Sequence, residues 1–132
     1  MRTPKVNAFV VSFDSRKDDA SGRLDLFGII GSMQVNELPL SLPGLTVFAS
    51  LTNLEGSYRR VLEVVELDND ELLSGIDQEE SVERSDPLQI WTEIAHIPGP
   101  ITIDRPGRYA CRLRMNGELL HESIFEIALL EA

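Results

Sequence analysis

Apolar side chains recur along the chain in short runs that are separated by clusters of Gly, Pro, Asn and Asp. Each run is rich in β-branched residues and about six to ten residues long, as is typical of β-strands. The longer runs are Val6–Phe13, Arg23–Gly31, Leu45–Thr52, Tyr58–Leu67, Leu88–Ile97, Gly107–Met115 and Leu119–Leu129, and the shorter ones are Glu71–Ser74 and Pro100–Ile103. This spacing predicts an all-β protein, a sandwich or barrel of antiparallel strands. No linker or repeat divides residues 1–132, so we expect a single domain.

A helix over residues 58–75 is the competing interpretation, because this segment is rich in Glu and Leu. Val61–Leu67 is too rich in valine for that interpretation, since β-branched residues favour strands. The turn-forming residues Asp68–Asp70 would also end such a helix early. We therefore expect a strand here.

Two of the predicted strands are apolar on both faces, unlike the alternating strand Leu45–Thr52. These are Val6–Phe13 and Leu24–Ile30, and a two-layer sandwich covers only one face of each sheet. Monomeric proteins rarely leave a large apolar patch exposed, and residues 32–44 would form only a short lid over it. We therefore predict a symmetric homodimer that is formed through these strands. The candidate interface residues on the first strand are Phe9, Val11 and Phe13.

The turn at Asn116-Gly117 joins the last two predicted strands, and its length sets their register. A two-residue loop would place Cys111 opposite Glu122 and mix apolar with charged faces. A three-residue loop with Gly117 in the left-handed conformation, a bulged turn, restores the agreement. In that register a row of arginines, including Arg112, lies beside a row of glutamates.

Several turn and strand signatures together resemble a family of small bacterial proteins of unknown function. The segment Ser21–Ile29 resembles that family's second strand, and Pro43–Leu51 resembles the strand that follows it. Asp68–Leu72, Pro106–Tyr109 and Asn116–Leu119 are also similar. The resemblance spans nearly all of the chain. It implies an immunoglobulin-like β-sandwich of seven to nine strands and adds no catalytic residue.

The charge is strongly negative and is concentrated in one segment. The 132 residues carry a formal net charge of −10, and the segment Glu66–Asp86 holds nine acidic residues against the single base Arg84. Such a field repels phosphate backbones, which argues against nucleic acid as a partner. We interpret the segment as a solvated acidic loop, with a docking site for a basic protein partner as the alternative.

The remaining composition argues for a protein of the cytoplasm. No apolar stretch is long enough to cross a membrane, and Ala8–Val11 is too short for the core of a signal peptide. The single cysteine, Cys111, cannot form an internal disulfide and suits a reducing compartment. We therefore expect no membrane association.

The residues that could carry chemistry are few. One cysteine and two histidines cannot form a zinc site, and no phosphate-binding loop occurs. Cys111 and His121 would lie on one face of adjacent strands, but Cys111 is flanked by apolar neighbours and fits a core position. Asp68–Glu71 resembles the start of a calcium loop, but leucines stand where a ligand and a glycine are required. We therefore predict no catalytic residue, no cofactor and no metal.

Trp91 is the only tryptophan, and alternation places it on the wetter face of its strand with Gln89 and Glu93. It either packs under the acidic segment or serves as an interface anchor or a platform for a sugar. Two classes of function remain. We expect a non-enzymatic interaction module with a protein partner. The alternative is a domain that binds a small molecule or a carbohydrate, or a hydrolase that uses His96, Cys111 and His121.

Overall fold

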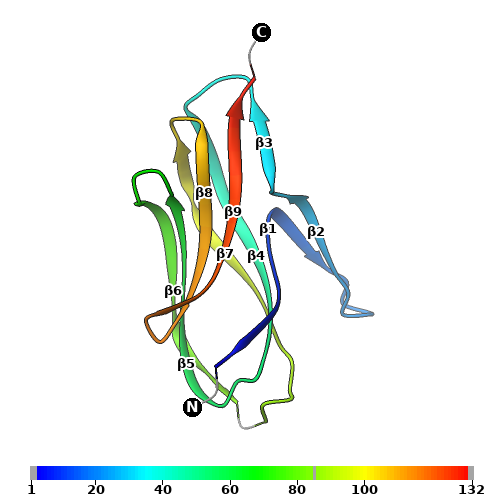
Figure 1. The fold of residues 1–132 in the computed structure, drawn as a ribbon. Helices are drawn as coiled ribbons and strands as arrows, with labels where there is room; N and C mark the ends of the chain where they lie inside the picture. Colours follow the sequence, from blue (N-terminus) through cyan, green and yellow to red (C-terminus); the bar gives the residue numbers. More distant parts are fainter. Residues whose placement is uncertain (1–2, 85, 131–132) are drawn as a thin grey trace.

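The computed structural model describes residues 3–84 and 86–130, and nine β-strands and no helix occur in that part of the chain. The strands, labelled in Figure 1, are β1 (Lys5–Lys17), β2 (Leu24–Ile29), β3 (Ser32–Val35), β4 (Leu40–Thr52), β5 (Gly56–Glu66), β6 (Glu71–Arg84), β7 (Trp91–Ile103), β8 (Gly107–Met115) and β9 (Glu118–Leu129). The predicted all-β class is confirmed. Within the described residues, no helix is long and apolar enough to cross a membrane.

The strands form two sheets, one of four strands and one of five. The first has the order β2-β1-β4-β7 and is antiparallel throughout. The second has the order β3-β9-β8-β5-β6 and is antiparallel except for the parallel pair β3–β9. The chain passes from the first sheet to the second between β2 and β3, so these two short strands lie at the edges of different sheets.

The core is one hydrophobic cluster to which strands of both sheets contribute alternate side chains. On β4 the alternation predicted for Leu45–Thr52 is observed, because Leu45, Val47, Ala49 and Leu51 are all buried. Side chains of β5, β8 and β9 pack with Leu45, Val47 and Leu51 in one hydrophobic cluster. Further members of this cluster are Tyr58, Leu62, Val64, Tyr109, Cys111, Leu113, Phe125 and Ile127.

Several predicted elements differ from the structure. The run Leu88–Ile97 and the run Pro100–Ile103 are parts of one strand, β7, which begins only at Trp91 and leaves Leu88 and Ile90 exposed outside it. Residues 32–44, expected to be a loop, contain all of β3 and the start of β4. A short strand with a distant parallel partner has no local sequence signal that separates it from a loop.

The acidic segment also differs from its prediction. Its residues from Glu71 to Arg84 form the long edge strand β6, so the interpretation as a solvated loop is wrong for that part. Its cross-strand pairs explain how an acidic strand is tolerated. Asp77 lies opposite Val61 on β5, and its carboxylate accepts hydrogen bonds from the Arg59 Nε at 3.1 Å and from its terminal nitrogen at 2.6 Å.

The length of the β8–β9 turn differs from its prediction, although the register beyond the turn matches the prediction. The loop contains two residues, Asn116 and Gly117, both with positive φ. The register shift lies one step further on, between Leu113 and Arg114, so Arg112 still faces Glu122 as expected. The position of the shift sets the environment of Leu119, which lies opposite Arg114 and is exposed.

Candidate interaction surface

The β1–β2 hairpin, at the edge of the four-stranded sheet, separates from β4 beyond Ser12. β1 pairs with β4 as far as Ser12↔Thr46, and from Ser12 onward it pairs with β2. The Ser12 hydroxyl is buried and donates a hydrogen bond to the Asp14 carbonyl at 3.1 Å, inside the strand where the partner changes. The outer part of the hairpin therefore has no neighbour on the far side of β2 and projects beyond the other strands (Figure 1).

This hairpin carries three exposed large apolar side chains, which we call the hairpin patch: Phe27 and Ile29 on one face of β2, and Phe13 on the opposite face, where it lies beside Gly28. Phe27 is 50 % exposed and Ile29 is 65 % exposed. Gly28, between them, has a φ of +68°, and a Cβ there would lie 2.7 Å from Cδ2 of Phe13. Only glycine adopts this conformation at little cost while leaving room for the phenylalanine ring. The sequence therefore holds the patch in place through a glycine.

The four residues predicted to form the interface lie in different environments. Phe13 belongs to the hairpin patch, and Phe9 is half-buried with its ring centroid 4.9 Å from that of His121. Val11 is only 2 % exposed and is part of the core, so it is not available for a surface contact. It pairs with the buried Val47 close to the end of the β1–β4 ladder. The exposed residues that sequence reasoning did not single out are Phe27 and Ile29, although the two-sided apolar character of Leu24–Ile30 pointed to them.

Trp91, the fourth of these residues, lies half-buried at the start of β7. The guanidinium carbon of Arg60 stands 4.7 Å from the centroid of its ring, an arrangement in which cation and aromatic face attract. Arg60 is itself nearly buried and forms an ion pair with Glu93, two residues beyond Trp91. The tryptophan thus belongs to a bridge between β5 and β7, and most of its packing is internal.

The end of the molecule near the β5–β6 turn is held by a buried carboxylate. Glu66 Oε2 accepts hydrogen bonds from the Asn69 side chain at 3.0 Å and from Arg105 at 2.9 Å. Burial raises the pKa of Glu66, but these hydrogen bonds and the charge of Arg105 outweigh it and lower the pKa below its ordinary value of 4.5. The neighbouring Asp68 and Asp70 pair with Arg108 and Arg112. These carboxylates are therefore engaged in ion pairs, and no cluster that could hold a metal occurs among the described residues.

Cys111 and His121 do not form a thiol–imidazole pair. Cys111 is completely buried and lies opposite Ser123, whereas His121 lies opposite Leu113 and packs against Phe9. Burial raises the pKa of the Cys111 thiol to about 12, so the thiol is protonated at neutral pH. His96 lies on the other sheet, where its Nδ1 is 3.0 Å from the Thr46 hydroxyl. The residues that sequence reasoning offered for a hydrolase are therefore scattered over the molecule.

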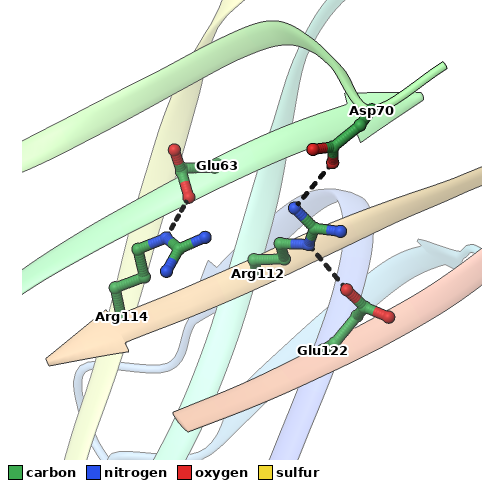
Figure 2. A network of polar contacts seen from close by, with 5 residues as sticks. All are labelled: Glu63, Asp70, Arg112, Arg114 and Glu122. Carbon is green, nitrogen blue, oxygen red and sulfur yellow. Dashed lines mark hydrogen bonds and ion pairs between the residues drawn. The ribbon is translucent and has the colours of Figure 1, made fainter. Parts of the chain in front are cut away.

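The outer face of the five-stranded sheet carries a network of opposite charges, which we call the charge ladder (Figure 2). Arg112 on β8 donates from Nε to Glu122 on β9 at 2.6 Å, and its Nη1 lies 3.3 Å from Asp70. Arg114 donates from Nε to Glu63 on β5 at 2.6 Å. The two arginines of this network thus offset two of its three carboxylates.

Among solved structures, the chain is similar to part of the alkylpurine DNA glycosylase AlkC from Pseudomonas fluorescens, which was solved bound to DNA containing an abasic site analog. The TM-score is 0.53 at 13 % sequence identity, and the similarity covers 96 % of this chain but 30 % of that protein. A likeness at this identity concerns the fold alone. No curated protein matches the sequence.

A family comparison covers most of the chain. Residues 8–128 match the family described as "Family of unknown function (DUF6941)". The match begins within β1 and ends within β9, so it includes both sheets, the hairpin patch and the charge ladder. The chain belongs to this family.

Proposed function

We propose that the two sheets form an immunoglobulin-like sandwich. One support is topological. The chain crosses from the edge of the first sheet at β2 to the edge of the second at β3, and β3 pairs in parallel with the last strand, β9. A second support is Tyr109, near the start of β8, whose hydroxyl donates to the Arg105 carbonyl at 2.6 Å. Such a tyrosine corner is a hallmark of immunoglobulin-like domains, where it stands two residues before a cysteine. Cys111 occupies that position here.

On this scaffold we propose a non-enzymatic interaction module of the cytoplasm whose docking element is the β1–β2 hairpin. The observation that carries the proposal is the hairpin patch on an edge strand. Edge strands present unpaired backbone groups, and soluble proteins usually protect them with charges or cover them. β2 instead displays Phe27 and Ile29 at the edge of its sheet. An edge with these properties favours addition of a strand from a partner.

A second copy of this chain is the partner that we propose. Two-fold dimers are the most frequent oligomers, and they need one self-complementary surface. In such a dimer the two β2 strands would pair antiparallel, and the Phe27 and Ile29 side chains of the two copies would contact each other across the two-fold axis. The net charge of −10 argues against nucleic acid as the partner.

Light scattering with two matched variants tests the dimer. Ile29→Glu places a charge in the hairpin patch, and Ile90→Glu changes an equally exposed isoleucine (64 %) outside it. We expect a mass of twice 14.7 kDa for the unchanged protein and for Ile90→Glu, and a monomer for Ile29→Glu. Circular dichroism establishes that both variants are folded. A monomeric unchanged protein, or an equal effect of the two variants, contradicts the proposal.

A further inference from the structure

A groove of about 760 Å³ lies between the β1–β2 hairpin and the outer face of β4 and β7. Its volume falls within the range of about 300–1,000 Å³ that is usual for small-molecule pockets. The groove exists because the hairpin departs from the sheet after Ser12 and so leaves space over the two strands that continue beneath it. It is separate from the hairpin patch, since neither Phe27 nor Ile29 lines it.

Two pairs of cross-strand neighbours define the walls of the groove. Phe48 on β4 lies opposite Ile94 on β7, and both are half-buried on the face that alternates with the core. On the hairpin, Lys17 lies opposite Leu24. Ser15 lies one alternate position before Lys17 and also lines the groove. The walls thus combine an apolar surface from Phe48, Ile94 and Leu24 with one cation.

Lys17 is the charge that faces this groove without an internal partner. No ion pair of Lys17 occurs within residues 3–84 and 86–130. Two of the carboxylates near it in sequence are engaged elsewhere. Asp18 accepts hydrogen bonds from the Ala20 backbone nitrogen and the Ser21 hydroxyl. Asp25 pairs with Arg23 at 3.4 Å, on the strand face opposite to Leu24.

We propose that this groove binds a small amphipathic carboxylate. Its apolar body would lie on Phe48 and Ile94, and its carboxylate would pair with the Lys17 ammonium. The net charge of −10 does not prevent this, because repulsion from distant carboxylates is screened beyond about 8 Å at physiological salt. The contact pair at Lys17 acts at short range, well within that screening distance. The site does not depend on dimerisation.

Titration with three eight-carbon probes, followed by two-dimensional NMR, tests the proposal. Octanoate carries a carboxylate, 1-octanol is neutral, and octylammonium carries the opposite charge. We expect octanoate to bind most tightly and octylammonium least tightly, with shifts at Phe48, Thr92 and Ile94. Lys17→Gln should weaken octanoate about threefold and leave 1-octanol unchanged, because only an ion pair at an exposed lysine is lost. Lys5→Gln, on the same strand but outside the groove, is the matched control and should change nothing.

A second variant tests the apolar wall separately. Ile94→Thr keeps a β-branched residue in the strand but shortens the apolar surface, so it should weaken octanoate and 1-octanol by the same factor. Equal binding of the three probes, an equal effect of Lys5→Gln and Lys17→Gln, or no shift of groove residues at millimolar octanoate would each overturn the proposal. Titration of octanoate into the Ile29→Glu protein distinguishes the two proposals. This variant should be a monomer in light scattering and should still bind octanoate.

Discussion

Replacing Glu122 by glutamine tests how much the charge ladder contributes to stability. Arg112 Nε donates to Glu122 Oε2 at 2.6 Å, and the two side chains are only 17 % and 28 % exposed. A hydrogen bond between charged groups contributes about 1.5–3 kcal/mol when it is well shielded. Glutamine keeps a neutral acceptor, and water reaches part of this pair. We therefore expect Glu122→Gln to lower the free energy of unfolding by about 1 kcal/mol.

Glu126→Gln is the matched control, because Glu126 is exposed and lies opposite Arg108 four residue pairs further along the same two strands. Exposed cross-strand pairs contribute about 0.2–1 kcal/mol, and Arg108 also lies 3.7 Å from Asp68. We expect this variant to cost less than half as much as Glu122→Gln. Urea unfolding at low and high salt gives both values, and a double-mutant cycle with Arg112→Gln isolates the coupling between Arg112 and Glu122. A coupling energy near zero, or a larger loss for Glu126→Gln, would refute the assignment of burial to this network.

Three further predictions concern buried groups. Cys111 should not react with a thiol reagent at pH 8 until the protein unfolds, because burial keeps it protonated; rapid labelling of the folded protein would contradict its placement. The pKa of Glu66 is lowered in the folded state. The contribution of the Glu66 carboxylate to stability is therefore complete above the ordinary pKa of 4.5 and is lost as the pH falls through the lowered pKa. Acid unfolding of Glu66→Gln should accordingly show a flatter pH dependence than that of the unchanged protein. Tyr109→Phe removes the donor to the Arg105 carbonyl and should cost about 1–2 kcal/mol in urea unfolding, whereas a neutral result would remove one support for the immunoglobulin-like assignment.

Local alternation was sufficient to predict the strands that contribute to the core. β4 and β8 follow their predicted patterns because one face of each packs into the hydrophobic cluster and the other does not. β3 has no such signal, since its four residues are defined by a parallel partner almost a hundred positions away. β6 was missed beyond its first residues because acidic side chains are poor strand formers, and the arginine that pairs with Asp77 lies on another strand.

The surface was predictable only in part. The two-sided apolar character of Val6–Phe13 and Leu24–Ile30 identified the correct hairpin, but alternation alone could not show where β1 changes partner. That change at Ser12 buries Val11 and exposes Phe13 and Ile29. The groove lined by Lys17 and Phe48 was equally beyond reach, because it depends on the direction in which the hairpin leaves the sheet.

Hydrogen–deuterium exchange at two protein concentrations tests the proposed docking edge most directly. If two copies pair through β2, the outward-facing amides of Leu24–Ile29 should exchange more slowly at high concentration. The edge strand of the other sheet, β6, is the internal control and should exchange at the same rate at both concentrations. In the Ile29→Glu protein the protection of β2 should disappear. Exchange of β2 that does not depend on concentration, or slowing of β6 instead, would contradict the hairpin as the site of association.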